Sequence, residues 1–386
     1  MHPIRKWFYK TLSGVNIDIT RDYRQVRRLQ HLSKPVFLPL YRAYDYKVLA
    51  EDGYEIPIRI FLPQSDPAVP PADPALAEGG NPAAAAPDAA AAAARPVLLF
   101  FHGGGWVIGD IDTYTSICQE ISDVTGSTVV SVDYRLAPEH PFPAGLSDCY
   151  AVALELFTHP EHLQTTTRQI TLIGDSAGGN LAAAVSLLAR QRGTFAPLRQ
   201  ILLYPATDAD FSDRSPFPSM KENGQDYLLT TDMLRGYMDL YVPDPDQRSN
   251  PLVSPLRASD LGGQPQTLIV TAQLDPLRDA GEAYGRRLAQ ADCGCAVYRL
   301  HDAIHGFMTH GQAAAPYINQ TFLLLTSFLD THTRLAEEDL RLAEEVLCEE
   351  RLNTLNLHPE GVISSADLAR YPGSAELKAA DEGESS

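Results

Sequence analysis

Short apolar runs alternate with amphipathic stretches through the middle of the chain. The apolar runs are rich in Val, Ile, Leu and Phe and predict strands over 97–101, 128–132, 170–173, 201–204, 267–271 and 296–300. The stretches between them predict helices over 113–124, 144–157, 180–192 and 280–291. Apolar strands that alternate with helices indicate a parallel sheet covered on both faces. The pattern therefore predicts an α/β fold with a mostly parallel central sheet.

Two further strands are predicted ahead of this region, over 46–49 and 56–61, around the turn residues Asp52-Gly53. Pro57 favours an edge or early position in the sheet for the second strand, because proline has no N–H to donate. Residues 63–96 are dominated by Pro, Ala, Asp and Gly, which predicts a disordered surface loop. Because the entropy of loop closure rises slowly with length, we expect the flanking strands to pair across this loop.

The alternation stops between Tyr204 and Thr267, where Pro, Asp and aromatic residues are frequent. One helix is predicted there, over 231–241. Because this insertion separates two core strands, we expect a cap segment over 206–250. Together with N-terminal cap helices in residues 1–45, it would cover one edge of a core that spans 46–330.

A seven-residue repeat marks the C-terminal extension. Arg334 to Leu340 reads RLAEEDL, and Arg341 to Leu347 reads RLAEEVL. The composition predicts an acidic helical extension over 331–386 with a frayed end. Two heptads are fewer than a coiled coil needs. An amphipathic helix that docks on its own core is therefore favoured, and a dimerising helix, which would make a homodimer, is the alternative.

Composition and charge argue against several classes of ligand and of cellular location. The chain has 386 residues and a formal net charge of −18, which argues against nucleic acid because phosphate-binding surfaces need clustered Lys and Arg. The five cysteines are odd in number and do not suggest a disulfide framework. Cys293 and Cys295 have no second Cys or His pair at zinc-ligand spacing nearby, so no metal is predicted. No apolar run has the length of a membrane helix and no signal peptide is recognised, which predicts a cytoplasmic protein without stable membrane insertion.

The stretch Gly174-Asp175-Ser176-Ala177-Gly178 joins a predicted strand to a predicted helix. A serine at the apex of so tight a turn is exposed at the edge of the sheet, where a substrate can reach it. The backbone N–H groups at the start of the helix point toward negative charge that develops beside it. A glycine-rich structural turn is the alternative interpretation, and the other strand ends decide between the two.

Glycines and an acid follow two of these strands. His102-Gly103-Gly104-Gly105-Trp106 comes directly after the strand at 97–101, and consecutive glycines can present free N–H donors to an oxyanion. Asp275 follows the strand at 267–271, where a carboxylate could orient a histidine. Asp279 and Asp302 are competitors for this role. Asp275 is preferred because Asp279 falls at a helix start, where acids are common as dipole partners.

A histidine follows the last predicted strand. His305 lies on the loop after 296–300 and before Gly306, from which an imidazole could reach the serine. His301 is close to the strand itself, and His310 is near the start of the next helix. The predicted nucleophile, acid and base therefore appear in the order Ser176, Asp275 and His305.

Five motifs in this order resemble the hormone-sensitive-lipase family of carboxylesterases, also called bacterial esterase family IV, over about residues 45–330. They are HGGGW at 102–106, DYRLAPEHPFPA at 133–144, GDSAGGN at 174–180, DPLRD at 275–279 and HGF at 305–307. The resemblance implies an α/β-hydrolase fold, with a mostly parallel central sheet, helices on both faces and a helical cap. It implies Ser176 as nucleophile, His305 as base and Asp275 as orienting acid, in the Ser, Asp, His order of α/β-hydrolases.

By the same resemblance, the N–H groups of Gly103, Gly104 and Ala177 form the oxyanion hole, and no metal or organic cofactor is needed. A serine carboxylesterase that hydrolyses short-to-medium acyl esters is therefore predicted. A hydrolase of another acyl bond, such as an amide, lactone or carbamate, would use the same groups. A non-catalytic binding protein on this fold is the third class, against which the intact Ser, Asp and His argue.

Overall fold

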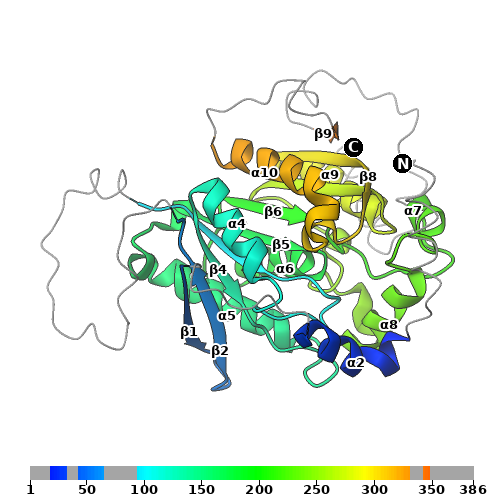
Figure 1. The fold of residues 1–386 in the computed structure, drawn as a ribbon, viewed down its shortest axis with the longest axis horizontal. Coiled ribbons are helices and arrows are strands. Elements are labelled where there is room, and N and C mark those ends of the chain that lie inside the picture. The colour runs from blue at the N-terminus through cyan, green and yellow to red at the C-terminus, as the bar shows by residue number, and fades with distance from the viewer. Residues whose placement is uncertain (1–17, 33–41, 65–93, 331–341, 348–386) are drawn as a thin grey trace, which may run out of the picture.

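The computed structural model describes residues 18–32, 42–64, 94–330 and 342–347. Their centre is a nine-stranded sheet in the order β1-β2-β4-β3-β5-β6-β7-β8-β9, which Figure 1 shows between two layers of helices. All neighbouring strands from β4 to β8 run parallel, whereas β1, β2 and β9 pair antiparallel at the two ends. The strands are β1 (Ala43–Leu49), β2 (Glu55–Phe61), β3 (Val97–Phe101), β4 (Thr128–Val132), β5 (Ile170–Asp175), β6 (Arg199–Leu203), β7 (Gln266–Leu274), β8 (Cys295–Ile304) and β9 (Ala343–Leu347).

Alternate residues of the central strands enter two separate cores. In β3, Val97, Leu99 and Phe101 join one apolar cluster, and Leu98 and Phe100 join the other. This is the two-residue period of a strand whose faces are both buried. The helices are α2 (Ile19–Leu32), α4 (Thr115–Thr125), α5 (Ala144–Thr158), α6 (Ala177–Arg192), α7 (Pro218–Glu222), α8 (Thr231–Tyr241), α9 (Arg278–Gln290) and α10 (Ala315–Leu329). Short 3-10 turns are η2 (Pro160–Leu163), η3 (Thr167–Gln169), η4 (Pro245–Ser249), η5 (Pro255–Arg257), η6 (Phe307–Thr309) and η7 (Gly311–Ala314).

The two faces of the sheet carry different helices. Helices α4 and α10 contact one another and supply apolar side chains to the core that contains Phe100, and Figure 1 shows them together on the same side. Helices α5, α6 and α9 pack on the opposite face and contribute to the core that contains Phe101. The predicted parallel sheet with helices on both faces is therefore confirmed.

One predicted pairing is wrong. The strands that flank residues 63–96, β2 and β3, do not pair with each other, because β4 lies between them and pairs with both. The physical reason is the crossover through α4, which returns the chain to the side of β3 that faces β2. The long insertion therefore spans one strand of the sheet, which a short hairpin loop could not do. Residues 65–93 of the predicted disordered loop lie outside the described residues.

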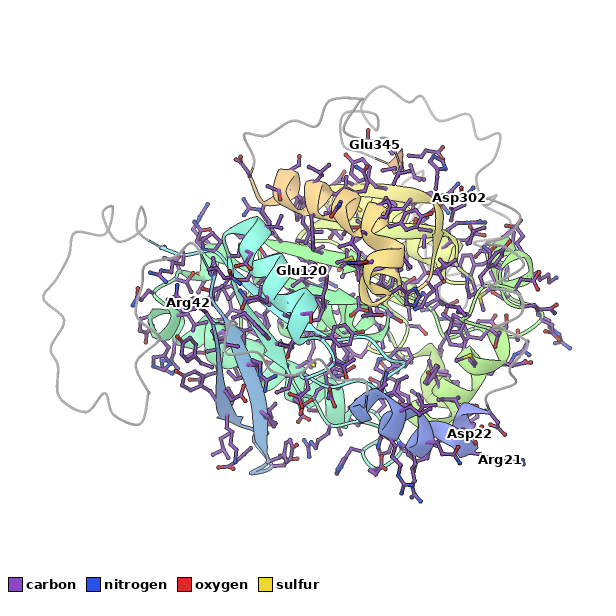
Figure 2. All side chains as sticks on the ribbon, in the orientation of Figure 1. Arg21, Asp22, Arg42, Glu120, Asp302 and Glu345 are labelled. Atoms are coloured by element: carbon purple, nitrogen blue, oxygen red, sulfur yellow. The ribbon has the colours of Figure 1, made fainter. Side chains whose placement is uncertain are left out.

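Two segments distant in the sequence meet over one edge of the sheet. Helix α2 contacts α8, where Ile19 packs so closely on Gly236 that an added Cβ would overlap its side chain. Helix α2 is amphipathic, since Tyr23 is buried whereas Arg21 is exposed on its outer side (Figure 2). The Arg27 guanidinium fixes α2 to the core by donating to the carbonyl oxygens of Val107 and Ala137. The helix predicted over 231–241 is confirmed as α8.

The described part of the C-terminal extension is a strand, not the predicted helix. Residues Ala343–Leu347 form β9, which pairs antiparallel with β8. Helical and extended patterns both fit the repeat, and the free backbone groups along the edge of β8 favour the extended one. The docked helix and the dimerising helix are both predicted on the two heptads of 334–347, and most of the second heptad is extended rather than helical. The first heptad, 334–340, lies outside the described residues.

Two expectations about chemistry concern the described residues only. Within these ranges, no helix combines the length and the hydropathy that crossing a bilayer requires. Four cysteines are described, Cys118, Cys149, Cys293 and Cys295, and each is a buried free thiol. Burial raises the pKa of the Cys118 thiol above its usual value, which disfavours the reactive thiolate.

Candidate active site

Ser176 stands alone between the last residue of β5 and the first residue of α6. Its backbone has φ 53° and ψ −117°, a conformation that L-residues rarely adopt. The turn is possible only because the residues two positions before and after Ser176 are glycines without side chains. A Cβ on Gly178 would overlap the carbonyl of Phe101, and a Cβ on Gly174 would overlap the carbonyl of Gly178. The predicted sharp turn with the serine at its apex is what the structure shows.

Three side chains from three loops meet at this turn. The Nε2 atom of His305 lies 2.8 Å from the Oγ of Ser176, and its Nδ1 lies 2.7 Å from Oδ2 of Asp275. The Asp275 side chain is 1% exposed and that of His305 is 10% exposed, so the chain of hydrogen bonds is shielded from solvent. This is the arrangement in which an imidazole can take the serine proton while the carboxylate fixes its tautomer.

Asp275 is itself held in place by its surroundings. Its Oδ1 accepts a hydrogen bond of 2.8 Å from the N–H of Leu277. The side-chain amide of Asn223, at the end of α7, donates to its backbone carbonyl. The Tyr204 ring meets the His305 imidazole edge-on, with centroids 5.0 Å apart. Contacts from Asn223 and from Tyr204, the residue after β6, therefore limit how far Asp275 and His305 can move.

The competing acids and histidines are engaged elsewhere. Asp279 accepts from the N–H of Ser219 and pairs with Arg278, so it ties α9 to α7. Asp302 belongs to β8 and lies at the periphery (Figure 2). His301 lies beside β9, with Nε2 3.9 Å from a carboxylate oxygen of Glu344. The structure therefore brings Ser176, Asp275 and His305 together, and none of the competitors is hydrogen-bonded to them.

The glycine loop after β3 departs from the prediction by one residue. The N–H of Gly103 donates to Oδ1 of Asp175 at 2.7 Å and also to the hydroxyl of Tyr114, so it is occupied. Within the described ranges, no hydrogen-bond acceptor faces the N–H groups of Gly104, Gly105 or Ala177. The backbone angles φ of Gly104 and Gly105 are +112° and +60°, which turn this loop away from the strand direction. The two glycine N–H groups left free in this loop are therefore those of Gly104 and Gly105, not those of Gly103 and Gly104 as predicted.

Asp175 is a buried carboxylate next to Ser176 to which the sequence analysis assigns no role. It accepts hydrogen bonds from the N–H of Gly103 and from the hydroxyls of Tyr114 and Tyr204. Burial raises the pKa of Asp175 from 3.8 to about 6, and the hydrogen bonds from Tyr114 and Gly103 oppose this rise. Because Tyr204 also contacts His305, the carboxylate links the glycine loop to the surroundings of His305.

Removing the Asp175 carboxylate is expected to impair turnover without preventing binding. Hydrogen bonds to a charged group contribute about 1.5–3 kcal/mol, so Asp175→Ala should lower kcat by about 10–100-fold with little change in KM. Asp175→Asn keeps an acceptor for Gly103 and should retain most of the activity. Steady-state kinetics of both variants check this, and equal losses of kcat in the two would contradict a positioning role.

Comparison of the wild type with Asp175→Asn also tests the charge of Asp175. A folded-state pKa of about 6 lies above the ordinary 3.8, so folding favours the protonated carboxyl. The stability that this provides is complete below about pH 4 and is lost as the pH rises through about 6. The Tm of the wild type relative to Asp175→Asn should therefore fall between about pH 4 and pH 7. A difference that stays constant over this range would contradict a buried, titrating carboxyl.

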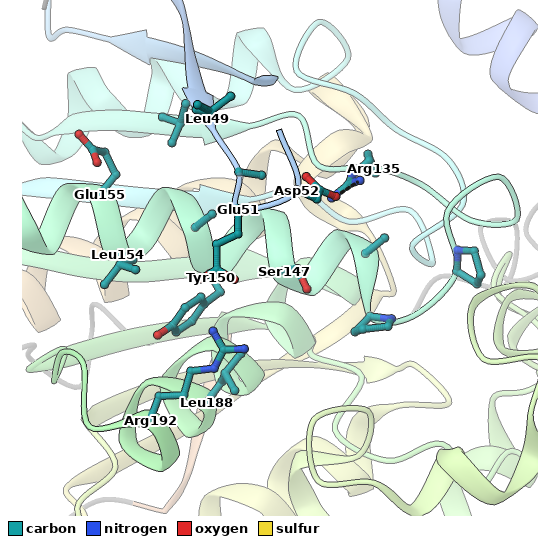
Figure 3. A pocket seen from close by; sticks show the side chains of 16 residues that line it. Leu49, Glu51, Asp52, Arg135, Ser147, Tyr150, Leu154, Glu155, Leu188 and Arg192 are labelled. Atoms are coloured by element: carbon teal, nitrogen blue, oxygen red, sulfur yellow. Dashed lines mark hydrogen bonds and ion pairs between the residues drawn. The ribbon is translucent and has the colours of Figure 1, made fainter. Parts of the chain in front are cut away.

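A cavity elsewhere on the core is separate from this site. It has a volume of about 400 Å³ and lies between the β1–β2 turn and the helices α5 and α6. Figure 3 shows Arg192 lying against the ring of Tyr150 at its floor, with 4.6 Å between the guanidinium carbon and the ring centroid. None of the residues that converge on Ser176 lines it, so this hollow is not the place where His305 acts.

Comparison with known proteins defines the class. Residues 98–309 match the α/β hydrolase fold family, and the chain is an α/β hydrolase. An arylesterase of Saccharolobus solfataricus is 34% identical over 297 residues, which cover 76% of this chain and 87% of that protein. An ethyl acetate hydrolase of Pseudomonas putida is 32% identical over 269 residues, which cover 69% and 76%. A hyperthermophilic esterase from the archaeon Pyrobaculum calidifontis has a TM-score of 0.69 at 28% identity, covering 85% of this chain and 98% of that one.

Within this superfamily, the chain belongs to the hormone-sensitive-lipase-like carboxylesterases, the bacterial esterase family IV. Its relatives include a carboxylic ester hydrolase of Mycobacterium tuberculosis that is 38% identical over 210 residues, which cover 53% of this chain and 55% of that protein. The chain is therefore a carboxylic ester hydrolase, as the sequence motifs predict.

Proposed function

We propose that the chain hydrolyses esters through a covalent acyl-enzyme on Ser176. His305 removes the proton from Oγ as this oxygen attacks the ester carbonyl carbon, and Asp275 stabilises the imidazolium that forms. The protonated His305 then gives its proton to the departing alkoxide, which leaves as the alcohol. The observation that supports this sequence is the pair of hydrogen bonds, 2.7 Å and 2.8 Å long, that join the three side chains.

The tetrahedral intermediates carry a negative oxygen that needs hydrogen-bond donors. We assign these donors to the N–H groups of Gly104, Gly105 and Ala177, because the N–H of Gly103 is already donated to Asp175. The N–H of Ala177 is at the start of α6, so the dipole of this helix adds to the stabilisation. In the second half of the cycle, water attacks the acyl-enzyme with His305 as base, and Ser176 is regenerated.

The proposed substrates are esters with short-to-medium acyl chains. The ring of Tyr237, a buried residue of α8, lies so near Gly105 that an added Cβ would be 2.5 Å from it. Helix α8 of the cap therefore packs against the glycine loop. This packing restricts the space beside the reacting carbonyl. Two relatives carry names that agree with small substrates, the arylesterase and the ethyl acetate hydrolase.

A series of 4-nitrophenyl esters tests the acyl preference. We expect kcat/KM to be highest among the acetate, butanoate, hexanoate and octanoate esters and to fall steeply for dodecanoate and hexadecanoate, because longer chains meet the cap. Initial rates with each ester measure this, with the matching 4-nitroanilides included to test for amide hydrolysis. A maximum at hexadecanoate would contradict the restricted pocket, and faster hydrolysis of the anilides would contradict the ester preference.

A further inference from the structure

Two histidines and two glutamates gather at the far end of α5, away from Ser176. Glu155 is on the last turn of α5, His159 caps this helix, and Glu161 and His162 belong to the following turn η2. Glu155 also lines the cavity described above, and Figure 3 shows its carboxylate at a distance from Tyr150 and Arg192. All four side chains are between 42% and 68% exposed, so an ion in solution can reach them.

The donor atoms of these side chains are already at ligand spacing. Nδ1 of His159 lies 3.3 Å from Oε1 of Glu161, and Nδ1 of His162 lies 3.7 Å from Oε1 of Glu155. Zinc bonds of about 2.0–2.2 Å to nitrogen and oxygen place two ligands of a tetrahedral ion about 3.3–3.6 Å apart. The ligand atoms of His159, Glu161 and His162 all lie within 4.8 Å of one another. The two rings are stacked with an interplanar angle of 17°, so at least one exposed ring must rotate for both ring planes to contain the ion.

We propose that His159, Glu161 and His162 bind a zinc ion, with Glu155 as the fourth ligand. Two imidazoles and two carboxylates suit Zn²⁺ better than Mg²⁺ or Ca²⁺, which prefer oxygen ligands alone. The ion would also reduce the repulsion between the two carboxylates. The sequence analysis predicts no metal because Cys293 and Cys295 lack a second Cys or His pair at zinc-ligand spacing. That criterion does not detect a site made of His and Glu side chains.

Backbone hydrogen bonds hold the turn that presents these ligands. The N–H of His159 donates to the carbonyl of Glu155, and that of His162 donates to the carbonyl of His159. Pro160 occupies the first position of η2, where its fixed φ favours the turn. The ligands therefore come from eight consecutive residues of a constrained segment, which lowers the entropy lost when they converge on an ion.

The bound ion would act on the core rather than on ester hydrolysis. Just after the turn, the carbonyl of Gln164 accepts from the N–H of Arg95, and the hydroxyl of Thr165 donates to the carbonyl of Arg95. Arg95 leads directly into β3, at the end of the Pro- and Ala-rich insertion. Because α5 is 15 residues long, about 22 Å of helix separates this turn from the cap-side end of α5. Zinc at η2 would thus stabilise the anchoring of β3 without touching the reacting groups.

The test is zinc binding by the full chain without a histidine tag. Equilibrium dialysis with metal analysis gives the number of zinc ions per chain, and competition with a chromophoric zinc indicator gives the affinity. The double variant His159→Gln/His162→Gln removes both imidazoles while keeping side chains of similar size. His301→Gln is the matched control, because His301 has a single carboxylate neighbour at 3.9 Å. Ester hydrolysis by all three proteins verifies that each is folded.

The wild type and His301→Gln should each bind one more zinc ion per chain than the double variant. The affinity of the double variant at this site should be more than about 100-fold weaker, since losses outside the ligand shell alone weaken binding by about 10–100-fold. Equal stoichiometry and affinity in the wild type and the double variant would overturn the proposal. Displacement of zinc by an equal concentration of Ca²⁺ would also overturn it, because that would indicate a general acidic surface.

Discussion

Ser176→Ala is expected to lower kcat for ester hydrolysis by about 10⁶-fold, because loss of a nucleophile in a serine triad removes nearly all of the rate that the triad provides. The fold should be preserved, since alanine keeps the Cβ and the strained backbone tolerates a small side chain. Initial rates with the best 4-nitrophenyl ester measure the loss, and circular dichroism measures the fold. Ser147→Ala, an exposed position on α5, is the matched control and should be as active as the wild type.

A rate within about tenfold of the wild type would contradict the nucleophile assignment, because the oxyanion donors alone leave only a residual rate about 10³–10⁴ above that in water. Loss of the folded spectrum together with activity would leave rate and structure confounded. The more conservative Ser176→Cys should then be measured, since a thiol keeps a nucleophile of similar size at the apex, and the account predicts that it transfers the acyl group at a reduced rate.

Asp275→Asn is expected to lower kcat by about 10⁴-fold, as replacement of the orienting acid does in serine triads. An amide at this position can present its N–H₂ group to Nδ1 of His305, which then carries no proton there and holds the wrong tautomer for accepting the serine proton. The side chain is 1% exposed, so water cannot take its place. Steady-state kinetics with the ester used for Ser176→Ala measure the effect.

The two competing acids supply the controls for this prediction. Asp302→Asn should be nearly neutral, because Asp302 has a φ of 59°, a conformation that asparagine also tolerates. Asp279→Asn should have a modest effect on rate, since Asp279 joins α9 to α7 through Ser219 and Arg278. A loss in either control as large as that in Asp275→Asn would contradict the choice of acid.

Much of the fold follows from the sequence because burial imposes a simple pattern. A parallel strand with helices on both faces has every side chain in one core or the other, as Val97 and Leu98 illustrate. Such strands are continuous apolar runs, and their carboxyl ends share one edge of the sheet. Ser176, Asp275 and His305 each follow such a run, which is why their convergence could be predicted without coordinates.

Other features depend on long-range geometry that local patterns do not contain. The order of β2, β4 and β3 is set by the crossover through α4, and the composition of the insertion carries no information about it. The segment 343–347 has a helical repeat, but its conformation is decided by the open edge of β8. In both cases the tertiary partner, and not the intrinsic preference, determines the outcome.

The glycine loop after β3 also depends on long-range geometry, here at a single residue. Three consecutive glycines identify the loop, but which N–H groups are free depends on an acceptor that is 72 residues away in the sequence. The Asp175 carboxylate takes the N–H of Gly103 and leaves those of Gly104 and Gly105. A buried acid beside the nucleophile was visible in the sequence as the second residue of Gly174-Asp175-Ser176, and its role depends on the partners that the fold brings to it.

The most direct test of the central claim is the site of covalent modification by an aryl alkylphosphonate ester. A phosphonate is attacked as the ester carbonyl would be, and the stable adduct marks the nucleophile. Peptide mass spectrometry of the treated wild type should find one phosphonyl group, on the peptide that contains Ser176, and the Ser176→Ala protein should remain unmodified. An active enzyme that carries the adduct on another residue, or an equally labelled Ser176→Ala protein, would contradict the account.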